Sequence, residues 1–196
     1  MAIALETIQS EFENQLLLPN IQSNTQFLIC PVGYVGAGKT TVVSPVAKTL
    51  NILKVSSNEL KKLLQESGNG FERAREILFP ILTRQIHAGR SIVLDMDCGN
   101  PHTAAWIRHA ERVYDIKVFW LHVNPPENFI VEKLKNFKHT WLFKNGQEAV
   151  QKYFEQKAHR KQEKQLMKFF YTFDPSRADL QLQIATCVQQ IQSEVK

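Results

Sequence analysis

The sequence has little cysteine and no long hydrophobic run, and each absence excludes a class of protein. Its three cysteines, Cys30, Cys98 and Cys187, are odd in number and widely separated. They therefore predict neither a disulfide framework nor a zinc site, and they favour a reducing cytoplasm. No apolar stretch approaches the roughly 20 residues that a membrane-spanning helix needs, so no membrane partner is expected. The first residues also lack the basic region and apolar core of a signal peptide.

Composition is that of an ordinary globular protein, but the charge is unevenly placed. A chain of 196 residues fits one α/β domain with a lid or short appendage. Its net charge is +5, yet residues 131–170 alone hold ten Lys and Arg against four Glu. Such a cluster can face phosphates, nucleic acid or only water. A solvated helix face is the commonest of these explanations.

The most informative stretch runs from Gly33 to Thr40 and reads GYVGAGKT. It fits G-x-x-x-x-G-K-[ST], the P-loop that cradles nucleotide phosphates. Glycines allow the backbone to curl around an anion, and the N–H groups of the loop and following helix face it. The pattern predicts ATP contacts from Gly33, Val35, Gly36, Ala37, Gly38, Lys39, Thr40 and Thr41.

Two side chains of this loop have predicted roles in chemistry. Lys39 would reach the β- and γ-phosphates, and the Thr40 hydroxyl would ligate Mg²⁺. The flanking sequence fits the motif, because the apolar run Phe27–Cys30 suits a buried strand and residues 41–50 continue as a helix. A flexible Gly-rich turn is the alternative interpretation, and it explains neither flank.

The remaining chain alternates between strand and helix patterns. Strands are predicted at 52–56, 91–95, 118–123 and 170–173, and a helix stripe precedes or follows each. Ser57 or Asn58 would cap the helix after the second strand, and Gly89 would end the long helix that starts near Phe71. Leu5, Ile8, Phe12 and Leu16 predict an N-terminal amphipathic helix. This alternation predicts a parallel sheet covered on both faces.

Ligands of such sheets collect beyond the carboxyl ends of the strands. This rule gathers the P-loop, the segment 57–59, Asp95, Asp97 and the turn 174–177 along one edge. Asp95 ends its strand as a Walker-B-type carboxylate should, holding Mg²⁺ directly or through water. A carboxylate that only caps the next turn is the alternative for Asp95. Asp97 could share the metal shell or act as a base.

The ordered set of motifs resembles the polynucleotide-kinase-like group of small P-loop kinases, which includes gluconate and zeta-toxin-type kinases. The matching segments are 33–41, 55–61 (VSSNELK), 89–95 (GRSIVLD), 121–127 and 174–177 (DPSR). The resemblance implies a P-loop NTPase fold with a five-stranded parallel sheet in the order 2-3-1-4-5. It also implies ATP-dependent transfer of the γ-phosphoryl group to a hydroxyl.

The N-terminal helix pattern divides the chain in two, and the resemblance implies a lid and further site residues in the second part. Residues 1–24 would form the N-terminal helix and linker, and residues 25–196 the kinase-like domain with a mobile basic lid at about 133–168. The lid cations would be Lys133 with Lys135, Lys138 or Arg160 as further candidates, neutralising charge on the transferring group. Ser176 and Arg177 would lie against the adenine.

One departure from the family pattern affects the chemistry. The family typically reads S-S-D-E-[IL]-R at the second strand, and here the Asp and Arg positions hold Asn58 and Lys61. An amide cannot accept a proton as a base, although it can orient a hydroxyl. Lys61 keeps the charge without bidentate geometry. Either Glu59 or Asp97 replaces the base, or the transition state needs little base, or no phosphate is transferred.

Three functional hypotheses remain open at this point. The favoured one is a cytoplasmic kinase that uses Mg²⁺ and ATP to phosphorylate a hydroxyl of a small molecule or nucleic-acid end. The second is an inactive or weakly active ATP-binding module that regulates a partner. The third, less favoured, is a nucleic-acid-binding ATPase, suggested by the basic stretch. The sequence leaves the acceptor and the oligomeric state undetermined.

Overall fold

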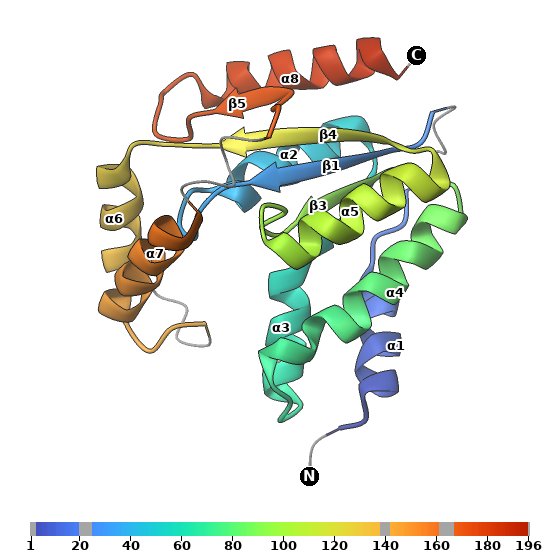
Figure 1. The fold of residues 1–196 in the computed structure, drawn as a ribbon, viewed down its shortest axis with the longest axis horizontal. Coiled ribbons are helices and arrows are strands. Elements are labelled where there is room, and N and C mark those ends of the chain that lie inside the picture. The colour runs from blue at the N-terminus through green and yellow to red at the C-terminus, as the bar shows by residue number, and fades with distance from the viewer. Residues whose placement is uncertain (1–2, 20–24, 138–141, 161–166, 196) are drawn as a thin grey trace.

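The protein is built on a five-stranded parallel sheet in the order β2-β3-β1-β4-β5 (Figure 1). The computed structural model describes residues 3–19, 25–137, 142–160 and 167–195. The strands are β1 (Phe27–Val32), β2 (Leu53–Ser56), β3 (Ile92–Asp95), β4 (Lys117–Val123) and β5 (Tyr171–Phe173). Every residue of β1 and β3 is buried, which is why these strands are almost continuously apolar. The predicted fold class and strand order are confirmed.

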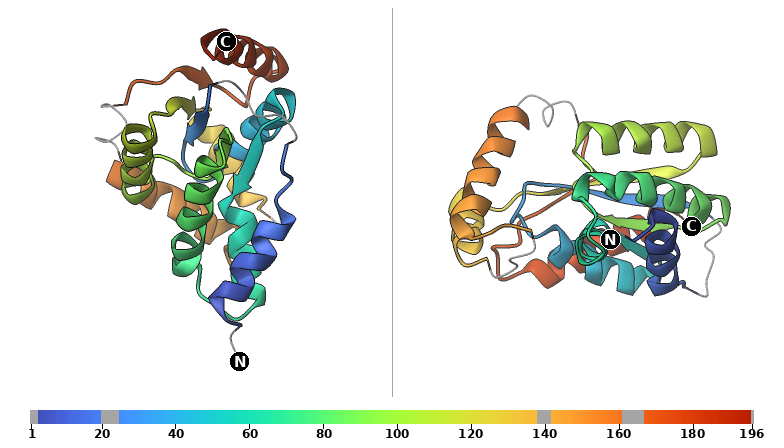
Figure 2. Two further views of the ribbon diagram at one scale, coloured as in Figure 1. Left: turned by 90° about the vertical axis from the view of Figure 1, so that its right-hand side faces the viewer. Right: turned by 90° about the horizontal axis from the view of Figure 1, so that it is seen from below.

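Helices cover both faces of the sheet. They are α1 (Leu5–Gln15), α2 (Lys39–Leu50), α3 (Ser57–Glu66), α4 (Ala74–His87), α5 (Pro101–Tyr114), α6 (Glu127–Lys135), α7 (Gly146–Arg160) and α8 (Leu180–Glu194). Alternate residues of β1 belong to different apolar cores, one shared with α1, α3, α4 and α5, the other with α2, α6, α7 and α8. The right-hand view of Figure 2 shows α5 on one side of the strands and α2 and α8 on the other.

Two helix starts differ from the predicted ones. Ser56, not Ser57 or Asn58, is the N-cap of α3, and its hydroxyl accepts a hydrogen bond from Glu59 N at 3.4 Å. The prediction was wrong by one residue because adjacent serines and an asparagine are all suitable caps. The helix predicted from Phe71 begins with a 3₁₀ turn at Phe71–Arg73 before α4. Gly89, with φ +74°, follows the end of α4 as predicted.

The N-terminal helix packs against the body of the protein. Ile8 and Phe12 of α1 are buried in the core that also contains residues of α3 and α4. Glu13 pairs with Arg84 of α4 at 2.5 Å. The predicted linker falls partly on residues 20–24, which lie outside the described residues. The division of the chain at residue 24 stays a prediction.

The segment predicted as a lid, at about 133–168, contains the end of α6 and the whole of α7, and these two helices lie side by side (Figure 1). Helix α6 begins before that segment, at Glu127. We refer to α6 and α7 as the lid helices, and their motion as a lid stays a prediction. The Tyr153 hydroxyl of α7 donates a hydrogen bond to Glu127 of α6 at 2.9 Å, and Lys157 pairs with the same carboxylate. A Cβ on Gly146 would lie 2.3 Å from the Lys135 main-chain oxygen, so α7 begins against the end of α6. Among the described residues, no helix is long and apolar enough to cross a membrane.

Candidate functional site

The P-loop joins the end of β1 to the start of α2. Gly36 and Gly38 have φ angles of +80° and +95°, a region that side-chain-bearing residues rarely adopt. A Cβ on Gly33 would lie 2.6 Å from a main-chain oxygen of β4, so the loop starts in close contact with that strand. The Lys39 ammonium donates hydrogen bonds to the carbonyl oxygens of Gly33 and Tyr34, each at 2.9 Å. The Lys39 side chain therefore lies along the P-loop, where it is predicted to contact the β- and γ-phosphates of ATP.

A hydrogen bond connects the P-loop to the end of β3. The Thr40 hydroxyl donates to Asp95 Oδ1 at 2.8 Å. Asp95 is 2% exposed, and its Oδ2 has no hydrogen-bond donor among the residues that the structure describes. The ammonium of Lys54 lies 3.9 Å from this Oδ2 oxygen. Burial raises the pKa of the Asp95 carboxyl above its usual value, while the Thr40 hydrogen bond acts in the opposite direction.

This pair fits the requirements of a nucleotide-bound magnesium ion. Mg²⁺ is usually held by one or two protein groups, with waters and phosphate oxygens completing the octahedron. Thr40 offers a hydroxyl and Asp95 offers a buried oxygen without a hydrogen-bond partner in the described chain. No group of three or more His, Cys, Asp or Glu side chains within the described ranges could hold a metal by itself. The donor set therefore suits a metal brought in with a phosphate ligand.

The lid helix α6 packs directly on the P-loop. A Cβ on Gly36 would lie 2.8 Å from Leu134 Cγ, and Lys133 Nζ is 3.7 Å from the place of a Cβ on Gly38. The Lys133 ammonium lies 5.9 Å from the centroid of the Phe129 ring. Burial, and then the nearby Lys39, lower the pKa of Lys133. The Lys133 ammonium thus approaches the glycine that precedes α2, while the Lys39 ammonium lies at the start of the loop.

The other candidate lid cations are placed differently. Lys135 is exposed and pairs with Glu132 of its own helix at 2.8 Å. It therefore lies on the outer surface of α6 instead of joining Lys133 at the loop. Lys138 lies outside the described residues, as does the side chain of Arg160.

The second lid helix, α7, also contacts the P-loop, and the sequence analysis did not single out its contacting residues. Val35 N donates a hydrogen bond to Gln156 Oε1 of α7 at 3.0 Å. The rings of Tyr34 and Tyr153 meet edge to face with centroids 5.5 Å apart. No motif marks Gln156, because a glutamine on a polar helix carries no sequence signal. Only the position of Tyr153 on the apolar side of α7 could have indicated a buried contact.

The turn predicted to lie against adenine adjoins the P-loop through its proline. Pro175 Cβ and Cγ are each 3.3 Å from the place of a Cβ on Gly38. Ser176 is exposed and its hydroxyl donates to Asp174 at 2.6 Å. Arg177 is exposed and pairs with Asp179 at 2.8 Å. The turn is thus at the predicted edge, whereas its serine and arginine bond within the turn and the start of α8.

Of the remaining P-loop positions, Ala37 and Thr41 have different surroundings. Ala37 is buried, and its N–H donates to the Tyr34 carbonyl at 3.2 Å. Thr41 is exposed in the first turn of α2. Both main-chain groups belong to the turn that a phosphate would meet.

The candidate acceptor side is formed by the start of α3 and the loop after β3. Asn58 is exposed in the first turn of α3. Glu59, the first candidate base, pairs with Lys54 of β2 at 3.2 Å. Asp97, the second, accepts a hydrogen bond from Gly99 N at 3.1 Å and so helps to shape its own loop. The structure brings all three side chains to the predicted sheet edge.

Two cations at this side were not predicted. Lys54 pairs with both Asp95 and Glu59, and Arg75 of α4 lies close enough to Lys61 to affect its titration. The pKa of Lys61 is lowered by burial first, then by Lys39 and Arg75. Strand alternation could have placed Lys54 on the face of Ser56. No pattern in the sequence links Arg75 to α3.

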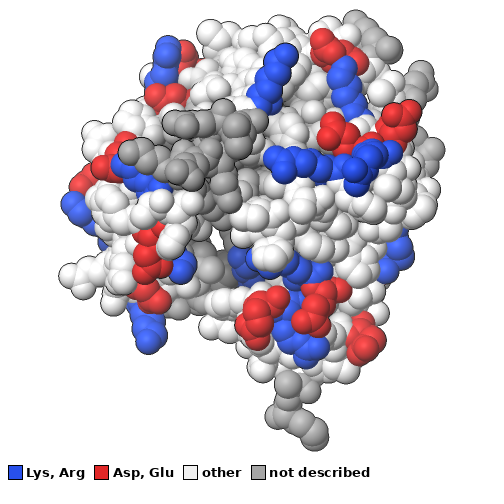
Figure 3. All heavy atoms as spheres, viewed as in Figure 1, with Lys and Arg blue, Asp and Glu red and all other residues white. Residues whose placement is uncertain are grey.

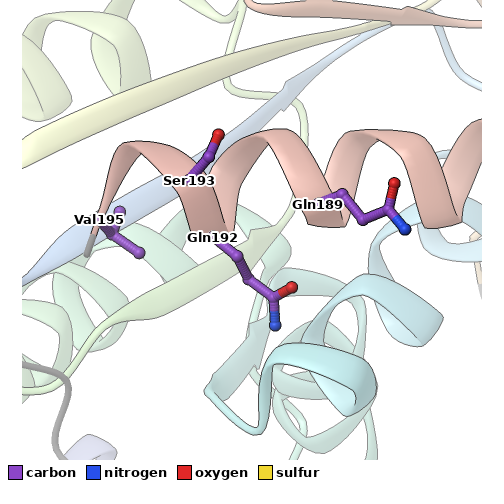
Figure 4. A pocket seen from close by; sticks show the side chains of 4 residues that line it. All are labelled: Gln189, Gln192, Ser193 and Val195. Atoms are coloured by element: carbon purple, nitrogen blue, oxygen red, sulfur yellow. The ribbon is translucent and has the colours of Figure 1, made fainter.

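One surface hollow lies away from these residues. Its volume is about 550 Å³, and its lining residues are Gln189, Gln192, Ser193 and Val195 (Figure 4). Lys117, the first residue of β4, donates to the Glu194 main-chain oxygen at 3.1 Å. The end of α8 therefore lies at the amino ends of the strands, the edge opposite the P-loop. This hollow is not part of the candidate site.

Comparison with known proteins agrees with this geometry. A family model described as an AAA domain matches residues 28–169, which is most of the chain. The protein therefore belongs to this AAA domain family of P-loop NTPases. No curated protein matches the sequence.

Solved structures of small kinases share the fold. The chain is similar to shikimate kinase from Bacteroides thetaiotaomicron, with a TM-score of 0.56 and 19% identity over 85% of this chain and 97% of that one. A putative kinase from Chloroflexus aurantiacus gives a TM-score of 0.60 and 14% identity over 86% and 97%. APS kinase from Mycobacterium tuberculosis, solved with AMPPNP and APS, gives 0.52 and 13% over 86% and 96%. At these identities the similarity establishes the P-loop kinase fold.

Proposed function

We propose that the protein is a kinase that binds Mg²⁺ and ATP and transfers the γ-phosphoryl group to a hydroxyl. The observation that carries this proposal is the hydrogen bond of 2.8 Å between Thr40 and Asp95. It joins the P-loop to the strand end where a magnesium-binding carboxylate is needed. The family membership and the kinase fold support the same class of reaction.

Each part of the proposed donor site has a physical role. The loop N–H groups and the start of α2 would bind the phosphates of ATP, and Lys39 would turn toward the β- and γ-phosphates. Thr40 and Asp95 would hold Mg²⁺, which would neutralise negative charge on the phosphates of ATP. Lys133, close to Gly38, would stabilise the charge of the transferring group. Ser176 and Arg177 would border the base.

On the acceptor side, we propose that Asn58 orients the hydroxyl by hydrogen bonding. Phosphoryl transfer through a loose transition state depends mainly on positioning and charge, so a strong base is not essential. Glu59 pairs with Lys54 at 3.2 Å, so accepting the proton of the acceptor hydroxyl would break this ion pair. Asp97 is then the remaining carboxylate for this role. Lys61 would supply positive charge beside the acceptor.

A transfer assay tests this proposal directly. Labelled γ-phosphate from ATP is followed across nucleosides, sugars and 5′-hydroxyl oligonucleotides with the wild type, Glu59→Gln and Asp97→Asn. We expect transfer by the wild type, a small effect of Glu59→Gln and a larger loss in Asp97→Asn. Absence of transfer while ATP binds would favour an ATP-binding module that regulates a partner.

That second function is favoured by one observation, the amide at position 58. Asn58→Asp distinguishes the two functions, because strong transfer that appears only in the variant would identify the natural protein as a binder. The nucleic-acid-binding ATPase has less support, since Lys152 and Lys157 of α7 pair with Glu155 and Glu127. It predicts oligonucleotide affinity that falls steeply with salt.

A further inference from the structure

The side chain of Lys54 reaches from the edge of the sheet to the end of β3. Lys54 is the second residue of the edge strand β2, and Ser56, two residues further along, pairs with Asp95 of β3. Side chains two residues apart on a strand point to the same face of the sheet. Lys54 and Asp95 therefore share a face. It is the face of α2, because Thr40 of that helix donates its hydroxyl to Asp95.

The Lys54 ammonium lies between two carboxylates. Its Nζ donates a hydrogen bond to Glu59 Oε1 at 3.2 Å. Asp95 Oδ2 is 3.9 Å from the same ammonium, which is too far for a hydrogen bond but close enough for electrostatic attraction. This oxygen is also the one without a hydrogen-bond donor among the described residues. Lys54 therefore neutralises Asp95 without donating a hydrogen bond to it.

The pair of Lys54 with Asp95 differs from the ion pairs on the surface. Figure 3 shows Asp and Glu atoms beside Lys and Arg atoms on the outside of the molecule. A pair of this kind, Lys62 with Glu66, joins side chains that are 60% and 58% exposed, and water screens their attraction. The Asp95 side chain is only 3% exposed. Water screens the charge of Lys54 less at this carboxylate, so the lysine affects any other cation that approaches Asp95.

A metal ion at Asp95 would be repelled by the same ammonium. The groups that fit a nucleotide-bound Mg²⁺ are Thr40 and Asp95, and Lys54 is already 3.9 Å from the Asp95 oxygen that such an ion would use. Without nucleotide, the protein offers the ion one buried carboxylate whose charge Lys54 already balances. The phosphates of ATP add negative charge and favour the ion. Lys54 can then shift toward Glu59, to which it already donates.

We propose that Lys54 is a positioning residue that keeps Mg²⁺ away from Asp95 until nucleotide is bound. It acts through Asp95, whose buried charge it balances in the nucleotide-free protein. Glu59 is the alternative partner that accepts the lysine when the metal site is filled. This role assigns Glu59 a function other than that of a base. The inference rests on the proposed metal site at Thr40 and Asp95, but it does not require phosphate transfer.

Metal binding to the nucleotide-free protein tests this role. The probe is Mn²⁺, which suits the same oxygen ligands as Mg²⁺ and whose free concentration is measured by electron paramagnetic resonance. Lys54→Met should bind Mn²⁺ about tenfold more tightly than the wild type, because it removes a repelling charge next to a buried ligand. Lys54→Arg should keep the wild-type affinity. Lys117→Met, which removes a strand lysine paired with Glu194 at the opposite edge, should also keep it.

A change at Glu59 should act in the opposite direction. Glu59→Gln removes the alternative partner of Lys54, so the ammonium stays at Asp95 and Mn²⁺ should bind more weakly than to the wild type. In the Lys54→Met background the same change should have a smaller effect, because no lysine is left to redirect. A lysine that only supported the structure would instead give weaker Mn²⁺ binding in Lys54→Met, with a lower free energy of unfolding.

The outcomes separate this inference from the proposed function. Tighter Mn²⁺ binding by Lys54→Met, lost again when Asp95→Asn is added, would support the inference even if the wild type transfers no phosphate. Phosphate transfer by the wild type, together with equal Mn²⁺ affinities of the wild type and Lys54→Met, would support the kinase and overturn the inference. Weaker Mn²⁺ binding by Lys54→Met, or no Mn²⁺ binding by either protein, would also overturn it.

Discussion

Replacing Gly36 with alanine tests the close packing between the lid helix α6 and the P-loop. Gly36 has a φ of +80°, and an added Cβ would lie 2.8, 2.9 and 3.1 Å from three Leu134 side-chain carbons. Leu134 is fully buried, so it cannot move aside into solvent. Alanine would therefore force the loop and α6 apart, in addition to straining the backbone.

The expected loss of stability is the sum of two effects. A left-handed backbone at a non-glycine residue costs about 1–2 kcal/mol. Overpacking against Leu134 adds about 1–3 kcal/mol. Gly89→Ala is the matched control, because Gly89 has a φ of +74° and no atom within 4 Å of an added Cβ. Gly89→Ala should lower the free energy of unfolding only by the backbone contribution, about 1–2 kcal/mol.

A double-mutant cycle measured by urea unfolding completes the test. Leu134→Ala alone should lower the free energy of unfolding by about 2–5 kcal/mol, because it leaves a cavity. Gly36→Ala combined with Leu134→Ala should be less destabilising than the sum of the single changes by about 1–3 kcal/mol, because the cavity accommodates the new methyl group. Additive effects, or equal losses for Gly36→Ala and Gly89→Ala, would refute the close contact between loop and lid.

Three further changes probe the site and its supports. Asp95→Asn should stabilise the ligand-free protein at pH 7, because the buried carboxyl has a raised pKa and its ionised form is unfavourable. This gain in stability should vanish below the ordinary pKa of aspartic acid, because the Asp95 carboxyl is then protonated in both the folded and the unfolded protein. Calorimetry should also show weaker binding of Mg-ATP to the variant. Tyr153→Phe should cost about 1 kcal/mol in urea unfolding by removing the hydrogen bond to Glu127, and no loss would contradict that contact. Gln156→Ala should speed hydrogen exchange at the Val35 amide, measured by NMR, because it frees that N–H; unchanged exchange would show that α7 does not hold the loop.

The fold could be predicted because its signals are local. Apolar runs such as Phe27–Cys30 specify buried strands, and the P-loop motif specifies the strand, loop and helix around it. The strand order 2-3-1-4-5 came from the resemblance to known kinases, and it is confirmed. The start of α3 was misplaced by one residue, since consecutive capping residues give no basis for choosing Ser56.

The site could be predicted only in part. Lys39, Thr40 and Asp95 follow from the motif and the strand end, and the structure brings them together. The contact of Val35 with Gln156 joins residues 121 positions apart. No sequence pattern links these two residues, because contacts of this kind depend on how distant elements pack. Arg75 was missed for the same reason, since only the packing of α4 beside α3 brings it near Lys61.

The most direct measurement is transfer of labelled γ-phosphate from ATP, with Mg²⁺, to the panel of nucleosides, sugars and 5′-hydroxyl oligonucleotides. The wild type should transfer phosphate only when Mg²⁺ is present. Lys39→Ala and Asp95→Asn should each reduce the rate by about a hundredfold or more, because each removes preorganised charge from the phosphate site. Wild-type protein that binds ATP without transferring phosphate, or transfer that both variants retain, would contradict a kinase site built from the P-loop and Asp95.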